Sequence, residues 1–473
     1  MRIPSVRPLA LALLSSVLLA SPLHAQSRDA APIPRASIDQ ATQLRERALT
    51  DGTAYALIES LTTEIGPRLP GSEADARAVA WATARFEALG YDKVWTEPVT
   101  FPKWERRSER AAVVGAHAQP LVITALGGSP AGDVTAELVR FDSLAALEAA
   151  EPSTLRGKLA FVDVPMARTR DGSGYGAAGP VRSAGPSIAA RKGAAGYLMR
   201  SIGTSPHRVA NTGITRFDAD VTPIPSAAMS LPDADQLTRL LQRGPVQVHL
   251  ALDVGWNGEY TSQNVIAELT GREAPDEIVL IAGHLDSWDL GTGAVDDASG
   301  VGITMAAGHL IGQLPQRPRR TVRVVAFANE EQGLLGARAY AEAHGGADVI
   351  AKHVIGAESD FGAGRIYGFN TSAPAGQRAA SDAIAEVLRP LGIDYLTDKG
   401  SPGPDISPLA AKGGAWGWLG QDGSDYFDLH HNADDTLDKV DPDAVAQNTA
   451  AYAVFAWLAA EAEGGFGSAP KAP

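Results

Sequence analysis

The sequence predicts an α/β fold in which a mostly parallel mixed sheet lies between helices, with a small β-rich domain inserted into the larger one. From residue 262 onward, short apolar runs rich in β-branched residues alternate with helical segments, a pattern typical of parallel sheets covered by helices. Residues 118–255 instead hold short β-rich runs separated by Gly, Pro and Ser. The chain has 473 residues, which is enough for more than one domain.

The N-terminus carries the pattern of a secretory signal peptide. Arg2 and Arg7 precede an apolar run that ends at Ala20, and this run is too short for a stable membrane span. Ala25 offers a small residue at the cleavage point, so residues 1–25 are assigned to the signal peptide. We therefore expect an exported protein that is periplasmic or extracellular after cleavage.

Composition excludes several classes of partner. The chain is 45% hydrophobic, which is ordinary for a soluble globular protein, and its net charge of −14 argues against a nucleic-acid surface. No other stretch is long and apolar enough to cross a bilayer, and the absence of Cys excludes disulfides and a lipid anchor at the cleavage site. We expect no nucleic-acid partner and no membrane anchor, and metal ligands must be His or carboxylate.

Residues 26–117 are assigned to the first part of the large domain. The segment 66–91 is predicted to hold an amphipathic helix that is capped by Ser72, carries acids in its first turn and ends at Gly90. Its apolar stripe consists of Val79, Ala82, Phe86 and Leu89.

Residues 118–255 are assigned to the inserted domain. One helical piece is expected there, at 186–192, directly before a strand at 195–200. Further strands are predicted at 121–125, 134–141, 158–164 and 246–252.

Residues 256–462 are assigned to the second part of the large domain. Strands are predicted at 278–282, 322–328, 354–357 and 415–419. Helices are predicted at 298–314, 333–343, 375–388 and 443–461. The Gly-, Ala- and Pro-rich residues 463–473 are expected to form a disordered tail.

Histidine and acidic residues stand directly after the first three of these strands. His284 follows the first strand, Glu330 and Glu331 follow the second, and Asp360 follows the third. Ligands of open α/β sheets bind outside the carboxyl ends of the strands, so these side chains are expected at one edge.

Two further pairs can join that edge. Asp296 and Asp297 lie in the turn before a helix, and His430 and His431 come late in the chain. Such nitrogen and oxygen ligands suit zinc in an open, catalytic site. The acids outnumber what one ion needs, whereas two ions about 3.5–4 Å apart would use them all and would offset their repulsion.

Each pair also has an ordinary structural interpretation. Asp296 and Asp297 alone are more often a helix cap, and Glu330 and Glu331 alone usually favour a helix dipole. His430 and His431 alone are uninformative. The joint placement at strand ends, in this order, favours the metal centre.

The motifs GHLDSWD, GAVDDASG, NEEQGLLG, ESD and YFDLHHNADDT resemble those of the zinc exopeptidases of peptidase family M28. Among these, the chain is most similar to the carboxypeptidase Q branch, also called plasma glutamate carboxypeptidase. The insert resembles the protease-associated domain that this branch carries. The resemblance implies the zinc exopeptidase fold, and similar proteins form homodimers.

The resemblance also implies a role for each site residue. Two zinc ions per chain would be held by His284 and Asp360 at one site, by His431 and Glu331 at the other, and by Asp296 between them. Glu330 would be the general base. Choosing His431 rather than His430 follows the family's spacing to an Asp-Thr pair.

Two acids are expected behind the ligands. The carboxylate of Asp286 would accept a proton from the ligand His284, which fixes the tautomer of the imidazole. Asp297 would shape the turn behind Asp296, and the resemblance implies a cis peptide bond between these two acids.

The expected function is hydrolysis of short peptides or dipeptides that have free termini, in the manner of a dipeptidase or aminopeptidase. A catalytically inactive binding or scaffold protein of the same fold is the first alternative. A glutaminyl cyclase shares the fold but lacks the insert, and a partner protein that binds the insert is the remaining alternative.

Overall fold

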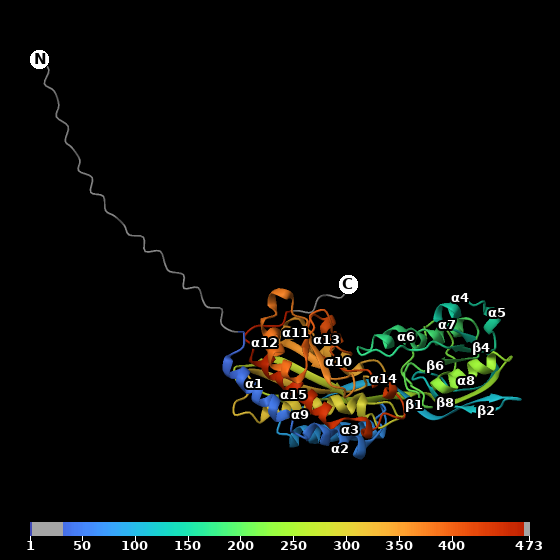
Figure 1. The fold of residues 1–473 in the computed structure, drawn as a ribbon, viewed down its shortest axis with the longest axis horizontal. Helices are drawn as coiled ribbons and strands as arrows, with labels where there is room; N and C mark the ends of the chain where they lie inside the picture. Colours follow the sequence, from blue (N-terminus) through green and yellow to red (C-terminus); the bar gives the residue numbers. More distant parts are fainter. Residues whose placement is uncertain (2–31, 468–473) are drawn as a thin grey trace. The chain divides into compact units, whose positions relative to one another are not determined.

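The computed structural model describes Met1 and residues 32–467, so the predicted signal peptide and the last residues of the predicted tail lie outside the described part. An eleven-stranded mixed sheet forms the framework (Figure 1). Nine strands follow one another in the order β11 (His353–Glu358), β9 (Ala274–His284), β10 (Arg320–Phe327), β8 (Gln247–Leu269), β4 (Gly132–Phe141), β5 (Leu159–Val162), β6 (Gly196–Arg200), β7 (Ser226–Met229) and β3 (Ile123–Ala125). The other two are β1 (Lys93–Val114), which pairs with β8, and β2 (Gln119–Leu121), which pairs with β1.

Helices cover both faces of the sheet section that carries the site, as the sequence predicted. Neighbouring strand residues point to opposite faces, and on β9 Ile281 belongs to one core cluster while Leu280 and Ala282 belong to another. The first cluster is covered by α1 (Arg35–Ala48), α2 (Thr53–Ser60), α3 (Glu73–Ala88), α9 (Ser299–Gly312), α12 (Ala379–Leu388) and α15 (Pro442–Glu461). The second cluster is covered by α10 (Leu335–His344) and α13 (Ser407–Ala411), while the short α11 (Ala347–Ile350) precedes β11.

The three strands whose ends carry the candidate site residues are parallel. β9 lies between β10 and β11 and runs parallel to both, whereas β8 runs antiparallel to β10. Every residue of β10 is buried, which explains its mostly apolar sequence, rich in Val. The carboxyl ends of β9, β10 and β11 therefore meet at one edge.

The inserted region contains more helix than its sequence indicated. One helix was expected, at 186–192, and it is present as α7 (Gly185–Arg191). Four others accompany it: α4 (Leu144–Ala149), α5 (Pro152–Leu155), α6 (Ser173–Ser183) and α8 (Leu231–Leu241). Ser230 caps α8, so this helix carried a sequence signal, whereas the Gly-, Ala- and Ser-rich α6 reads as a loop.

The insert and the large part share one sheet. The long strands β1 and β8 pair from Lys93 to Val114, and β4 of the insert pairs with the first half of β8. Separate apolar clusters nevertheless fill the two regions. The domain boundaries at 117 and 255 stay predictions.

Two details differ from the sequence prediction near the C-terminus. The strand expected at 415–419 is β14 (Gly417–Gln421), which joins β12 (Ile366–Thr371) and β13 (Asp394–Tyr395) in a separate three-stranded sheet. Phe466, placed in a disordered tail, is fully buried in the core cluster that includes α15. The apolar surface of that aromatic ring outweighs the Gly-rich sequence around it.

No helix among the described residues is both long enough and apolar enough to span a membrane.

Candidate metal centre

Backbone register places three of the predicted residues at one edge. His284 is the last residue of β9 and lies opposite Phe327, the last residue of β10. Glu330 and Glu331 follow in the loop to α10, and Asp360 stands two residues beyond β11. The structure thus brings together what the sequence predicted from strand ends.

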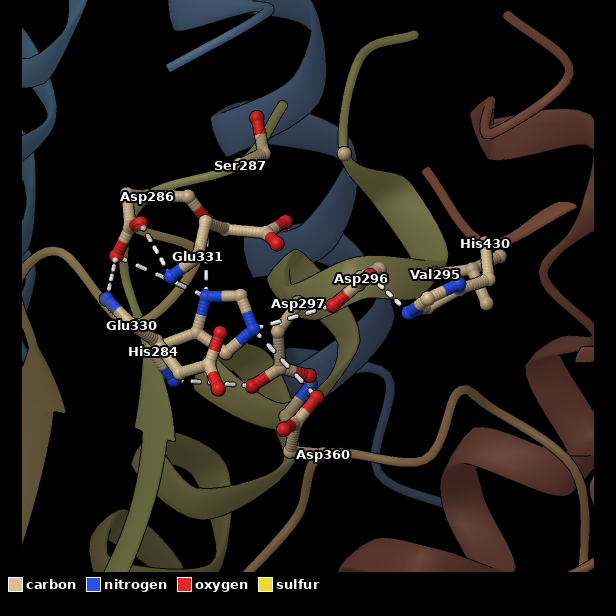
Figure 2. A network of polar contacts seen from close by, with 12 residues as sticks. His284, Asp286, Ser287, Val295, Asp296, Asp297, Glu330, Glu331, Asp360 and His430 are labelled. Atoms are coloured by element: carbon tan, nitrogen blue, oxygen red, sulfur yellow. Dashed lines mark hydrogen bonds and ion pairs between the residues drawn. The ribbon is translucent and has the colours of Figure 1, made fainter. Parts of the chain in front are cut away.

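His284 faces two of the acids with one ring nitrogen (Figure 2). Its Nε2 lies 3.1 Å from Oδ1 of Asp296 and 3.5 Å from Oδ1 of Asp360. The ring is 1% exposed, so neither contact is shared with bulk water. Nε2 is therefore the nitrogen that a metal ion at this position would meet.

Asp296 also faces the late histidine pair with its second oxygen. Nε2 of His431 lies 3.3 Å from Oδ2 of Asp296 and 2.8 Å from Oε2 of Glu331. His430 stacks on His431 with ring centroids 3.4 Å apart, but its Nε2 is 3.7 Å from Asp296. His431 thus approaches both acids more closely than His430 does, and the choice of His431 as the ligand stays a prediction.

The turn Ala294–Ala298 presents Asp296 between the two histidines. The peptide bond between Asp296 and Asp297 is cis, as expected. Asp297 accepts hydrogen bonds from the backbone N–H of His284 at 3.0 Å and of Gly300 at 2.9 Å. Its carboxylate thus joins the end of β9 to the start of α9, which is the turn-shaping role predicted for it.

Asp286 differs from its predicted role. Its carboxylate is 3.8 Å from Nδ1 of His284, whereas its backbone carbonyl oxygen lies at 3.1 Å from the same nitrogen. The carboxylate instead accepts the backbone N–H groups of Glu330 at 3.0 Å and Glu331 at 3.2 Å. Because two amides occupy this carboxylate, a carbonyl orients the His284 ring, and Asp286 fixes the loop with the adjacent glutamates.

A cavity of about 420 Å³ opens onto these groups. Glu330 is half-buried in its wall, together with Glu331, Asp296, Asp360 and His431. Burial raises the pKa of Glu330 well above its usual value, and the negative charges of Asp360 and Glu331 add to this. A carboxylate with a raised pKa beside a cavity accepts a proton more readily than an exposed one.

The pKa values of three other acids of the site are also shifted. Burial opposes the charged form of Asp296, yet the hydrogen bond from His284 and the close imidazoles of His431 and His430 hold the pKa of Asp296 well below its usual value. Burial raises the pKa of Glu331 to about 7. Burial also raises the pKa of Asp297 well above the usual range.

The donor set fits metal ions. Oδ2 of Asp296 and Oε1 of Glu331 are buried without hydrogen-bond partners. Zinc binds such atoms at about 2.0–2.2 Å, so two ligand atoms on one tetrahedral ion lie about 3.3 Å apart. The spacings around Asp296 are 3.1 Å to His284 and 3.3 Å to His431.

Residue groups of suitable composition overlap at this site. Three groups of His, Asp and Glu have ligand atoms within 4.8 Å of one another: Asp296 with His430 and His431, His284 with Asp296 and Glu331, and His284 with Asp297 and Asp360. All five predicted ligands belong to these groups. His430 and Asp297 belong as well, although neither was predicted as a ligand.

Arg68 supports the site but was given no role by sequence reasoning. It is fully buried and donates to the carbonyl oxygens of Leu285 at 2.7 Å, Thr292 at 2.7 Å and Gly293 at 2.9 Å. These carbonyls belong to the loop between His284 and Asp296. The only sequence signal was its place in the IGPRLPGSE segment, which resembles the same family.

Asp435, the acid of the Asp-Thr pair that follows His431, contacts the turn directly. It accepts the backbone N–H of Val295 at 2.6 Å and of Asp296 at 3.2 Å. Burial raises its pKa to about 7. The Asp-Thr spacing could have indicated this role, because a residue at a fixed distance from a ligand is commonly its support.

The insert holds the histidine pair from the other side. The amide nitrogen of the Asn211 side chain donates to the His430 carbonyl at 2.7 Å, and the backbone N–H of Thr212 donates to the His431 carbonyl at 2.9 Å. The Thr212 carbonyl oxygen lies 3.3 Å from Nδ1 of His431. No metal motif marks residues 211–212, so the sequence gave no sign of this contribution.

Two loop residues without a predicted role lie near the site. Tyr426 lines the cavity, and Asp405, whose charge acts on Glu330, is 1% exposed with both carboxylate oxygens lacking a hydrogen-bond partner. Ser424 and Asp425 line a neighbouring cavity instead.

The chain is similar to known proteins in sequence and in fold. The model of peptidase family M28 matches residues 264–456. Carboxypeptidase Q of Mus musculus is 32% identical over 416 residues, which are 86% of each chain. A peptidase M28 precursor from Shewanella amazonensis SB2B has a crystal structure with 48% identity and a TM-score of 0.89, covering 92% of this chain and 99% of that one.

A more distant structure shares the fold alone. The zinc aminopeptidase BSAP from Bacillus subtilis is 20% identical, with a TM-score of 0.61 over 85% of this chain and 94% of that chain. The site geometry, the family match and the coverage of carboxypeptidase Q agree. The chain belongs to peptidase family M28, a family of metallo-exopeptidases.

Proposed function

We propose that this protein is an exported di-zinc exopeptidase that hydrolyses short peptides with free termini. One observation carries the proposal: Asp296 directs one carboxylate oxygen to His284 and the other to His431, at 3.1 Å and 3.3 Å. A carboxylate placed between two imidazoles in this way suits a bridge between two metal ions.

The ligands divide between two sites. His284 and Asp360 would hold one ion, His431 and Glu331 the other, and Asp296 both. When bound, the two ions supply a water molecule of lowered pKa and a positive field for the negative charge that develops on the peptide carbonyl oxygen.

Glu330 is the group that moves the proton. It follows Glu331 directly, and Asp286 fixes the backbone amides of both residues. Glu330 lines the cavity, where its carboxylate can accept a proton from the attacking water and pass it to the leaving amine.

The cavity size supports a small substrate. A volume of about 420 Å³ lies in the lower part of the usual range for small-ligand sites, about 300–1,000 Å³, and suits a dipeptide or a short peptide end. The expected export is part of the proposal and rests on the sequence pattern of residues 1–25.

The test uses residues 26–473, reconstituted with zinc and compared with a chelator-treated sample. Hydrolysis of one neutral dipeptide is measured in three forms: with both ends free, N-acetylated, and C-amidated. Metal content is measured on the same preparation. N-terminal sequencing of the protein secreted by its host checks cleavage near Ala25.

The outcomes separate the modes of action. If only acetylation stops cleavage, the enzyme is an aminopeptidase; if both blocks stop it, the enzyme is a dipeptidase. Two bound zinc ions without turnover of any form would instead support the inactive scaffold. Absence of bound metal would overturn the proposed centre.

A further inference from the structure

The inserted region forms part of the wall of the active-site cavity. Tyr175, Arg182 and Ile214 come from the insert, and they line the same cavity as Glu330 and Asp296. Tyr175 and Arg182 lie on α6, the helix whose sequence reads as a loop. A substrate at the metal centre would therefore lie against this helix.

Arg182 has few partners of its own. Its Nε is buried without a hydrogen-bond partner, and Nη1 reaches the Thr212 carbonyl only at 3.4 Å. Two other arginines of the insert form close ion pairs: Arg191 with Asp220 at 2.8 Å, and Arg200 with Asp163 at 2.6 Å. Arg182 has no comparable ion pair among residues 32–467. It is the one permanent cation among the residues lining the cavity in the described part of the chain.

Its surroundings hold the guanidinium in place and leave room for it. The group lies over the Tyr175 ring at 5.3 Å from the centroid, and that ring meets His430 edge-on at 5.0 Å. A Cβ at Gly213 would come within 2.2 Å of Nη1 of Arg182. Glycine at 213, with φ +142, thus keeps open the space that the guanidinium occupies.

We propose that Arg182 binds the C-terminal carboxylate of the peptide substrate. This inference rests on the proposed exopeptidase function and adds a subsite that the insert contributes. The guanidinium offers several N–H donors in a planar fork that matches a carboxylate. With the carboxylate held there, the enzyme selects peptides that end close to the bond being cut.

The test compares Arg182→Gln with the wild type on a neutral dipeptide and on its C-amidated form. The ratio of the two kcat/KM values is the readout. We expect Arg182→Gln to lower this preference for the free carboxylate about 10- to 100-fold, the range for losing a hydrogen bond to a charged group. The loss should appear in KM more than in kcat, with metal content and melting temperature unchanged.

Two further variants control the experiment. Arg191→Gln makes the same substitution at an exposed, ion-paired arginine of the insert and should leave the preference unchanged. Arg182→Lys keeps the charge but loses the fork, so it should lose part of the preference. If Arg182→Gln fails to fold, this conservative variant still decides the question.

The inference is overturned if Arg182→Gln lowers kcat/KM equally for both substrates, which would indicate a purely structural contact with Tyr175. It is also overturned if neither rate changes. A wild type that binds zinc but hydrolyses neither substrate would contradict the proposed function itself, which is a distinct result.

Discussion

Asp296 shows at the scale of one residue how this chain balances buried charge. Its carboxylate is 4% exposed and contacts imidazoles on both sides, while Oδ2 has no hydrogen-bond partner. Burying a carboxylate is costly unless it is paired or coordinates a metal. A buried carboxylate that lies between two imidazoles and keeps one oxygen without a hydrogen bond is therefore a strong sign that the cluster is built for cations.

Glu330 and Glu331 are adjacent but should respond differently to the same substitution. Glu330→Gln should retain metal and lower kcat about 10²- to 10⁴-fold, because general acid–base catalysis contributes that much. Glu331→Gln should instead lower the zinc content, because Glu331 lies 2.8 Å from His431 in the ligand cluster. Elemental analysis and steady-state kinetics on both variants check this.

Loss of zinc in Glu330→Gln would contradict the division of roles. Full turnover in that variant would show that another group moves the proton.

At the scale of elements, two side chains that accept hydrogen bonds, Ser72 and Asp75, fix the start of α3. Ser72 caps the helix by accepting the N–H of Asp75 at 3.1 Å, as its sequence indicated. The Asp75 carboxylate accepts from the Gly71 N–H at 2.9 Å and from the Ser262 hydroxyl at 2.7 Å. It thereby ties the start of α3 to β8.

Asp75 makes the stability of this junction depend on pH. Burial raises the pKa of Asp75 from 3.8 to about 6. Because the folded pKa is the higher one, stability from this group is fully present below 3.8 and is lost as pH rises through about 6.

Asp75→Asn stays neutral and keeps one acceptor oxygen. Its free energy of unfolding relative to the wild type should therefore rise by up to about 3 kcal/mol between pH 4 and pH 7. Urea denaturation at several pH values measures the difference. A constant difference across this range would show that Asp75 titrates normally in the folded protein.

On the scale of the whole molecule, the segment after His284 anchors the metal centre to β1 and to the insert. Trp288 is 3% exposed and belongs to an apolar cluster that β1 and the insert share, with its ring 6.2 Å from that of Trp104 on β1. A Cβ at Gly127 would lie only 2.2 Å from the Trp288 ring. Asp289 forms an ion pair with Arg106 at 2.9 Å.

Removing this anchor should weaken the fold and the centre together. Trp288→Ala should lower the free energy of unfolding by about 3–5 kcal/mol, the usual cost of emptying a buried aromatic site, and should weaken zinc binding. Trp256→Ala is the matched control, because Trp256 is 51% exposed and should change stability by less than about 0.5 kcal/mol. Denaturation and zinc titration measure both effects. Equal destabilisation of the two variants would argue against the anchor.

Metal removal should also lower the stability of the whole molecule. Without bound ions, the acids of the centre are left close together and buried. A metal present at 100 times its Kd stabilises a site by about 2.7 kcal/mol, so a chelator should lower the melting temperature and readdition of zinc should restore it. A melting temperature insensitive to both treatments would contradict a metal centre.

Some features were predictable because their causes are local. The cap at Ser72, the apolar run of β10 and the acids after β9, β10 and β11 are all visible in short stretches of sequence. Helix α6 of the insert was not, because it is Gly-, Ala- and Ser-rich and gains its stability from packing in the core of the insert.

The sequence by itself determined the α/β class and the edge of the sheet where the His and acidic candidates meet, because strand period, residue types and chain order can be read from short stretches of sequence. Only the tertiary structure decided which atoms of Asp286 face His284, how Arg68 holds the loop carbonyls, and that Thr212 and Arg182 of the insert border the centre. These contacts join residues far apart in the chain. Their geometry depends on how the packed elements meet, which no short sequence pattern records.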